Sequence, residues 1–131
     1  MGKKKNQLYY WGNDLLHGDN HMCNIWTSGY PDTIGYQDGF KYTSPIGYFE
    51  ANSLGIFDMA GNVWEWCYNW HLPYEGNLEV FPLDLQGRAQ RGGSFLCNSN
   101  YCHGYRLSAR SATSPESSLF HVGFRCVKNI K

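Results

Sequence analysis

The stretch "LGIFDMAGNVWEWCYNW", residues 54–70, is the densest apolar segment of the chain and decides what fold to expect. Gly55 and Gly61 interrupt the segment, and glycine inside a helix is costly, so one continuous helix is not predicted. The segment instead predicts a short strand or turn at 55–57, a tight turn at 61–62 and a strand over 63–67. The side chains of that strand are expected to alternate between two faces.

The segments on either side repeat this strand-and-turn pattern. A second strand is predicted within residues 88–95 and a third within 122–127. Residues 71–87 hold two prolines and two glycines and predict a surface loop, and "SATSPESS", residues 111–118, predicts a polar turn region. Without an internal repeat or an interdomain linker, the sequence predicts a single α+β domain with short strands, little helix and much ordered loop.

The composition supports this expectation. A chain of 131 residues is long enough for one domain, and at this length roughly two-thirds of the unfolded surface can be buried. Aromatic residues make up 17% of the chain and there are 15 glycines. This combination favours irregular loops packed on rings over a helical bundle.

The charge pattern limits the possible partners and locations. The formal net charge is zero and the basic residues cluster only at Lys3–Lys5, whereas nucleic-acid binders carry a basic stripe. Residues 1–8 are therefore predicted to be a frayed basic end and residues 9–131 the domain.

No apolar stretch approaches the ~18 residues of a membrane span. No signal peptide pattern follows Met1, which favours the cytoplasm of a prokaryote.

The stretch "GGSFLCNSNYCHGYR", residues 92–106, places Cys97 and Cys102 five positions apart. Such a pair can form a structural disulfide, half of a zinc site or a pair of reactive thiols. The chain has five cysteines, and an odd number excludes a fully disulfide-paired monomer. Structural zinc sites use more closely spaced pairs, usually two of them. The spacing itself leaves the disulfide and the reactive pair open.

Four oxygen-bearing residues, Asn24, Asp38, Asp58 and Glu65, lie in loops that also contain glycine. Calcium binds about six to eight hard oxygen ligands, including carboxylates and backbone carbonyls. Bound calcium would pin loops that are otherwise entropically costly. The same residue types also serve as turn formers and caps, so the pattern itself allows either role.

Several ordered blocks resemble those of one family, the formylglycine-generating enzymes, also called sulfatase-modifying factors. The similar blocks include "YYWGN", "CNIW", "DGF", "GNVWEWC", "RGGSFLC", "ARSATSP" and "GFRCV", and they run from Tyr9 to Val127. The resemblance falls on the carboxy-terminal half of that enzyme fold. It implies a compact α+β fold related to C-type lectin-like domains, with short antiparallel strands.

The resemblance also implies an activity for the cysteine pair. Family members use dioxygen to convert a cysteine in an unfolded sulfatase segment, within a C-x-P-x-R motif, to formylglycine. Cys97 and Cys102 match the cysteines that bind copper(I) in that family, and soft copper(I) prefers thiolate ligands. Oxidation of the substrate sulfur would give a thioaldehyde, which water converts to the aldehyde. The implied partner is a cysteine-containing unfolded peptide.

Further residues match family positions near that pair. Ser94 and Tyr101 resemble polar groups of the oxygen and substrate-thiol pocket, and Trp64 resembles the tryptophan that forms its wall. Arg110 resembles an arginine near the substrate groove, and His121 stands where the family can carry an asparagine. Without the resemblance, purely structural roles are equally open: Ser94 could complete a turn, Trp64 could belong to the core and Arg110 could be a surface cation.

Two calcium sites follow from the resemblance. The first would use oxygens of Asn24, the Ile25 carbonyl, Asp38 and the Phe40 carbonyl. The second would use Asp58, the carbonyls of Gly61 and Val63, and Glu65.

The sequence also departs from the family pattern. Leu107 stands where the family often has a disulfide cysteine. Cys126 matches a position that pairs with an earlier cysteine in some members, and Cys23 is the nearest candidate here. The amino-terminal part of the family fold has no counterpart in this sequence. The sequence is therefore expected to be a minimal stand-alone version, a fragment, or a chain that associates with another copy or with a complementary amino-terminal half.

Two other functions compete with the enzyme. The first is a non-catalytic lectin-like domain that binds or displays ligands, because a shared fold does not confer activity. The second is a relative of the iron-dependent sulfoxide synthases, which need a histidine-rich iron site. The five histidines are scattered without a ligand motif, at His17, His21, His71, His103 and His121.

Overall fold

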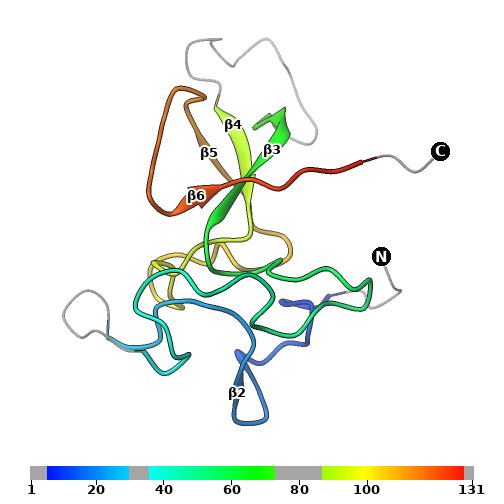
Figure 1. Ribbon diagram of the computed structural model, residues 1–131, viewed down its shortest axis with the longest axis vertical. Coiled ribbons are helices and arrows are strands. Elements are labelled where there is room, and N and C mark those ends of the chain that lie inside the picture. Colours follow the sequence, from blue (N-terminus) through cyan, green and yellow to red (C-terminus); the bar gives the residue numbers. More distant parts are fainter. Residues whose placement is uncertain (1–5, 30–35, 73–86, 129–131) are drawn as a thin grey trace.

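The computed structural model describes residues 6–29, 36–72 and 87–128. Within these ranges the regular elements are six short strands in two sheets, and no helix is present. Figure 1 shows the larger sheet at one end of the molecule and a mass of irregular loops at the other. The low content of regular structure agrees with the expectation from glycines and rings. In the described ranges no helix has the length and apolarity needed to cross a membrane.

The larger sheet has the order β5-β4-β3-β6. Its strands are β3 (Trp64–Trp70), β4 (Arg88–Arg91), β5 (Ser111–Thr113) and β6 (Val122–Gly123). β3 and β4 run antiparallel, as do β4 and β5, whereas β6 lies parallel to β3. The smaller sheet is a hairpin of β1 (Leu16–His17) and β2 (Asn20–His21).

The predicted turn at Gly61–Asn62 is confirmed. Both residues have positive φ, 70° and 63°. The Asn62 N–H donates to the Asn24 carbonyl at 2.8 Å, and a Cβ built on Gly61 would lie 2.2 Å from the Asn24 carbonyl oxygen. Glycine is therefore required here for two reasons, the left-handed backbone and the contact with a neighbouring segment. The turn directs the chain into β3.

The predicted strand over 63–67 exists but differs in two respects. It begins at Trp64 and continues to Trp70, and its side chains do not alternate between buried and exposed. Residues 64–67 are half-buried and residues 68–70 are exposed, with Tyr68 97% exposed. Burial falls along the strand because β3 leaves the loop-rich core, as Figure 1 shows.

The other strand predictions are partly correct. The strand expected within 88–95 ends at Arg91, because Gly92 and Gly93 adopt positive φ, 93° and 72°. The strand expected within 122–127 is limited to β6. The turn expected at 55–57 lies slightly earlier, over residues 52–55, where the Gly55 N–H donates to the Asn52 carbonyl at 2.9 Å and Gly55 has φ 75°.

The prediction of a turn region over 111–118 is wrong for its first three residues. Ser111–Thr113 form β5, whose partner is the distant strand β4, with Gln90 opposite Ser111. A pairing between segments so far apart overrides the local turn preference of serine and threonine. Of the predicted surface loop, residues 73–86 lie outside the described residues, as do residues 1–5 of the predicted frayed end. Leu8 is held in place, since its carbonyl accepts a hydrogen bond from the Leu107 N–H at 2.9 Å.

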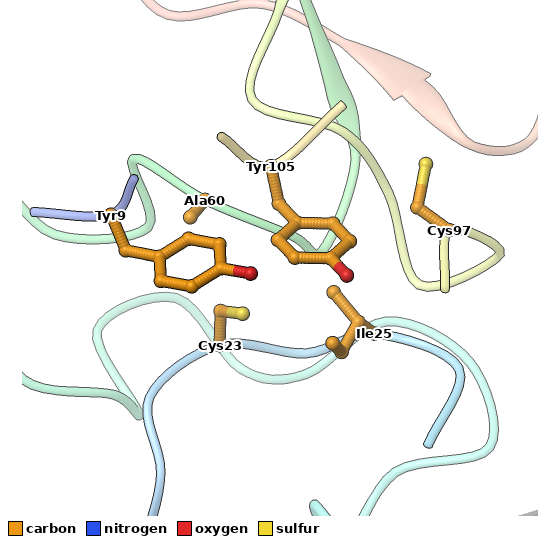
Figure 2. Close-up of a cluster of buried hydrophobic side chains, with 6 residues drawn as sticks. All are labelled: Tyr9, Cys23, Ile25, Ala60, Cys97 and Tyr105. Atoms are coloured by element: carbon orange, nitrogen blue, oxygen red, sulfur yellow. The ribbon is translucent and has the colours of Figure 1, made fainter. Parts of the chain in front are cut away.

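The core lies among the loops. Six buried residues from distant parts of the chain form one cluster, shown in Figure 2: Tyr9, Cys23, Ile25, Ala60, Cys97 and Tyr105. The Tyr9 ring stacks on Trp11 with centroids 4.8 Å apart and on Tyr105 at 5.7 Å. Stacked rings thus replace the aliphatic layers of a more regular fold.

Candidate functional site

Residues 94–105, which we call the thiol turn, bring the two closely spaced cysteines together. Cys97 and Cys102 form a disulfide, with Cα atoms 4.7 Å apart. The Cys97 N–H donates to the Ser94 carbonyl at 2.9 Å, and the Cys102 N–H donates to the Asn98 carbonyl at 3.1 Å. A disulfide is also the oxidised state of a redox-active pair. The geometry therefore suits both uses that the spacing left open.

The two sulfur positions differ in access. Cys97 is 2% exposed and belongs to the core cluster, whereas Cys102 is half-buried and packs against that cluster from outside. A reacting partner would therefore approach from the Cys102 side. Exchange at a disulfide requires access to a sulfur atom, so Cys102 is the more reactive position.

The Asn98 side chain fixes the backbone between the cysteines. Asn98 is 4% exposed, and its Oδ1 accepts hydrogen bonds from the N–H groups of Asn100 at 2.9 Å and Tyr101 at 2.8 Å. This is the backbone-capping role that asparagine commonly plays in turns. The sequence prediction did not include Asn98, although asparagine in a run of small polar residues is a turn signal.

Ser94 begins this turn, and Tyr101 lies within it, directly before Cys102. Ser94 is 1% exposed, and its Oγ accepts a hydrogen bond from the Leu96 N–H at 3.3 Å. Tyr101 is 73% exposed. The structure thus places Ser94 directly beside Cys97, whereas the Tyr101 ring is largely at the surface next to Cys102.

Trp64 and His121 meet at the start of β3. The half-buried Trp64 ring packs against the core cluster together with Cys102, and a Cβ on Gly104 would lie 2.4 Å from this ring. The Trp64 N–H donates to the His121 carbonyl at 2.8 Å. The His121 Nδ1 is buried and has no hydrogen-bond partner among the described residues. Burial lowers the pKa of His121, which favours the neutral imidazole.

Arg110 sits apart from these groups, at the residue before β5. Its Nη2 donates to the Leu72 carbonyl at 2.6 Å. Leu72 is the last described residue before residues 73–86.

The first predicted set of oxygen ligands is assembled around Asp38. The Asp38 carboxylate is 6% exposed and accepts hydrogen bonds from the Ile25 N–H at 2.8 Å and the Phe40 N–H at 3.1 Å. Desolvation raises the pKa of Asp38, although these bonds oppose the shift. Asn24 is fully buried and its Oδ1 has no hydrogen-bond partner among the described residues. A buried carboxylate beside an unused buried oxygen fits a hard cation.

The second predicted set is assembled less completely. Asp58 has φ 54°, and its Oδ2 accepts the Gly47 N–H at 2.7 Å while its buried Oδ1 has no partner in the described part of the chain. The Glu65 carboxylate is bound by the Arg125 guanidinium, which also donates to the Phe57 and Asp58 carbonyls at 3.0 Å. Asp58 fits a cation, whereas Glu65 is already paired.

The sequence prediction missed Arg125. Its side chain reaches 60 residues back to Glu65, and this bond is the first cause that raises the Arg125 pKa. The one sequence feature that could have drawn attention to Arg125 is its place in the "GFRCV" block, which resembles the family pattern.

The remaining cysteines are unpaired thiols. Cys23 is 2% exposed within the core, Cys67 is half-buried in β3 and Cys126 is exposed near the carboxy terminus. The suggested pairing of Cys126 with Cys23 is therefore wrong, because one lies in the interior and the other on the surface. Burial strongly raises the pKa of the Cys23 thiol.

The described residues form no cluster of side chains of the kind that holds zinc. In the described ranges, no three side chains from histidine, cysteine, aspartate and glutamate come together to hold a metal ion. A zinc site needs about four such ligands. Cys97 and Cys102 are thus a two-sulfur donor set, which suits a soft metal of low coordination number.

Comparison with known proteins gives consistent matches over the whole chain. The family model of the sulfatase-modifying factor enzyme 1-like domain matches residues 1–130. The formylglycine-generating enzyme of Thermomonospora curvata is 40% identical over 126 residues, covering 90% of this chain and 42% of that protein. The enzyme of the same name from Mus musculus is 38% identical over 129 residues, covering 95% and 35%.

A third relative carries a different name. The inactive C-alpha-formylglycine-generating enzyme 2 of Mus musculus is 30% identical over 131 residues, covering 98% of this chain and 39% of that protein. The chain therefore spans about two-fifths of the length of these relatives or less.

Two solved structures share the fold. Treponema denticola variable protein 1 superposes with a TM-score of 0.63 at 24% identity, covering 92% of this chain and 40% of that one. PvdO from Pseudomonas aeruginosa superposes with a TM-score of 0.58 at 26% identity, covering 82% and 38%. These likenesses confirm the predicted fold class.

Proposed function

Because the chain belongs to the sulfatase-modifying factor enzyme 1-like family, we propose that it oxidises a peptidyl cysteine to formylglycine at Cys97 and Cys102. The observation that carries this proposal is the disulfide between Cys97 and Cys102. It joins a buried sulfur, that of Cys97, to a more accessible one, that of Cys102. The active form would be the reduced pair, which the disulfide gives on gaining two electrons and two protons.

Copper(I) is the metal that this donor set fits best. Two thiolates without a third protein ligand from the described residues match its preference for soft, low-coordinate sites. When bound, copper(I) would supply the one-electron chemistry that allows dioxygen to react with a thiolate. The residues that would hold it are Cys97 from the core and Cys102 from the surface side.

The net reaction removes two electrons and two protons from the substrate Cβ and sulfur, which gives a thioaldehyde. Water then replaces the sulfur, so that an aldehyde and hydrogen sulfide leave. Dioxygen becomes two waters by accepting four electrons, two from the substrate and two from a thiol reductant.

The surrounding residues have separate tasks in this proposal. Ser94 holds the turn at Cys97 through its carbonyl and Oγ. Trp64 closes one wall of the site, and Tyr101 offers a ring at the exposed side where a peptide would arrive. His121, neutral and half-buried beside Trp64, would hydrogen-bond the peptide, and Arg110 would contact it further along.

Calcium is proposed as a structural cofactor. The first site, Asn24, Ile25, Asp38 and Phe40, is supported by the unused Asn24 oxygen and the buried carboxylate. For the second site, Asp58, Gly61, Val63 and Glu65, the support is the unused Asp58 oxygen, and Glu65 would have to share its carboxylate between calcium and Arg125.

The proposed partner is an unfolded, cysteine-containing segment of a sulfatase.

Large exposed side chains, among them Phe124 at 75% and Val127 at 87%, favour contact with a second copy or with a complementary amino-terminal half. Three unpaired thiols favour a reducing compartment such as the bacterial cytoplasm.

The test is turnover of a peptide that carries the C-x-P-x-R motif. Reduced protein supplied with copper(I), air and a thiol reductant should convert its cysteine to an aldehyde, detected by mass and by reaction with a hydrazide. The Cys97→Ser and Cys102→Ser variants should lose this activity by at least about a thousandfold. Cys67→Ser, which changes a cysteine outside the thiol turn, should retain it.

A non-catalytic binding domain is the second candidate. One relative that is 30% identical to this chain is named an inactive formylglycine-generating enzyme, so similarity of this degree does not by itself imply activity. If no aldehyde forms while a known enzyme of the family works under the same conditions, this second candidate is favoured.

A further inference from the structure

The three consecutive N–H groups that lead to and include that of Cys102 all donate to one residue, Asn98. The Asn98 Oδ1 accepts the Asn100 N–H at 2.9 Å and the Tyr101 N–H at 2.8 Å. The Asn98 carbonyl accepts the Cys102 N–H at 3.1 Å. An asparagine side chain that bonds to the backbone two and three residues further on replaces the hydrogen bonds of regular structure. The side chain of Asn98, which is 4% exposed, therefore sets the path of the chain between the two cysteines.

The two cysteines depend on this turn to different degrees. Cys97 is buried in the core cluster (Figure 2), its N–H donates to the Ser94 carbonyl, and its carbonyl accepts the Trp26 N–H at 2.9 Å. Cys102 is half-buried and packs against that cluster from outside, and its N–H is bonded within the turn. Once the disulfide is reduced, the position of the Cys102 sulfur relative to the Cys97 sulfur therefore depends on how well the turn is retained.

A turn that is held by hydrogen bonds and a disulfide that closes the same turn stabilise each other. The free energy by which the Asn98 hydrogen bonds favour the disulfide equals the free energy by which the disulfide favours those hydrogen bonds. Removal of the acceptor oxygen should therefore stabilise the two thiols relative to the disulfide, which raises the reduction potential of the pair.

We propose that Asn98 is a positioning residue whose side chain sets the reduction potential of the Cys97–Cys102 pair. It holds the Cys102 sulfur close to the Cys97 sulfur in the reduced protein and thereby favours the disulfide. Reduction of this disulfide takes two electrons and two protons from a dithiol reductant, which becomes a disulfide itself, and leaves one thiol on each cysteine. The inference deepens the proposed function, in which the reduced pair is the active form, but the potential is defined without metal or peptide.

The test is the equilibrium between disulfide and thiols in the full chain. Parent and variants are held without air in buffers of reduced and oxidised dithiothreitol and then alkylated, and peptides with Cys97 and Cys102 are analysed by mass. Asn98→Ala should shift the equilibrium about tenfold towards the thiols, which is a potential about 30 mV higher. Asn98→Asp keeps an acceptor oxygen and should stay within about twofold of the parent. Asn69→Ala, on the exposed end of β3, should have no effect.

Unfolding in urea separates positioning from general stabilisation. Asn98→Ala should lower the folding equilibrium constant about tenfold more in the disulfide form than in the reduced form, because both differences belong to one thermodynamic cycle. Equal losses in the two forms, or an unchanged potential, overturn the inference. A shift in Asn98→Asp as large as that in Asn98→Ala also overturns it, since the acceptor oxygen would not be the cause.

A milder variant covers the case in which Asn98→Ala does not fold. Asn98→Ser keeps a hydroxyl that caps turns more weakly than an amide oxygen, so it should shift the equilibrium about threefold towards the thiols. An equilibrium equal to that of the parent in Asn98→Ser would then overturn the inference.

The two proposals fail in distinguishable ways. A shifted potential without aldehyde formation keeps the role of Asn98 and removes the reaction. Aldehyde formation with an unchanged potential keeps the reaction and removes Asn98 from control of the thiol pair.

Discussion

The loop half of the molecule, residues 6–29, 36–63 and 92–110, and the sheet half, β3 to β6, are stabilised in different ways. In the sheet half, backbone ladders join short strands, and side chains such as Tyr68 and Phe124 are largely exposed on or beside it. In the loop half, buried side chains bond to the backbone of distant segments, as Asp38 does with Ile25. Figure 1 shows the two halves at opposite ends.

This difference teaches that most of the core lies outside the regular structure, with Ala89 and Gln90 of β4 as buried exceptions. The core cluster of Figure 2, which includes Cys97, lies wholly in the loop half. The thiol turn, which has little regular structure, is thus anchored in the buried cluster through Cys97 and Tyr105, and such support is what a catalytic site would need.

The largest effect is expected at the turn that joins the halves. Gly61→Ala would place a Cβ 2.2 Å from the Asn24 carbonyl oxygen in a left-handed backbone, and should lower the free energy of unfolding by at least about 4 kcal/mol. Gly55→Ala is the matched control. Gly55 has φ 75° but open space around it, so its change should cost about 1 kcal/mol. Urea denaturation followed by tryptophan fluorescence measures both, and equal costs would contradict the close packing at Gly61.

The next effect compares one side chain from each half. Ile25→Ala removes a residue that is 2% exposed and should cost about 3 kcal/mol, because it leaves a cavity in the core. Tyr68→Ala, at a residue 97% exposed on β3, should cost less than about 0.5 kcal/mol. Urea titrations in a calcium chelator isolate packing from metal binding. A larger loss from Tyr68→Ala would place the stabilising core in the sheet half.

Calcium should act on the loop half specifically. At a concentration about a hundred times its dissociation constant, calcium should raise the free energy of unfolding by about 2.7 kcal/mol. Asp38→Asn should reduce this gain, whereas Asp19→Asn, at an exposed hairpin residue, should not. Calorimetric melting with calcium or chelator provides the measurement, and an identical gain in both variants would remove Asp38 from the calcium ligands.

The smallest effect concerns the bond that ties the carboxy-terminal segment across the two halves. Arg125→Gln breaks the pair with Glu65 and the bonds to two carbonyls, and should cost about 1 kcal/mol, since the group is partly exposed. Lys128→Gln is the control and should be neutral within about 0.5 kcal/mol. The cost of Arg125→Gln should shrink at high salt, and a salt-independent cost would point to packing instead of charge.

The features that sequence predicted are those with a local cause. Glycine followed by asparagine fixed the turn at 61–62, and the aromatic run after it predicted β3. The glycines at 92–93, in contrast, end β4 earlier than expected because of their backbone conformation. The closeness of Cys97 and Cys102 followed from their spacing and from the family resemblance.

The features that sequence did not predict depend on partners far along the chain. Ser111–Thr113 becomes β5 only because β4 offers an edge, and Arg125 finds Glu65 across 60 residues. Local preference carries no signal for such pairings.

The most direct test of the central claim is a copper(I) titration of the reduced protein against a competing chelator, with thiols counted before and after. We expect one copper(I) per chain, with two thiols protected, and loss of this binding in both Cys97→Ser and Cys102→Ser but not in Cys67→Ser. Copper(I) binding that survives in the Cys97→Ser/Cys102→Ser double variant, or that is absent from the parent protein, would contradict the account.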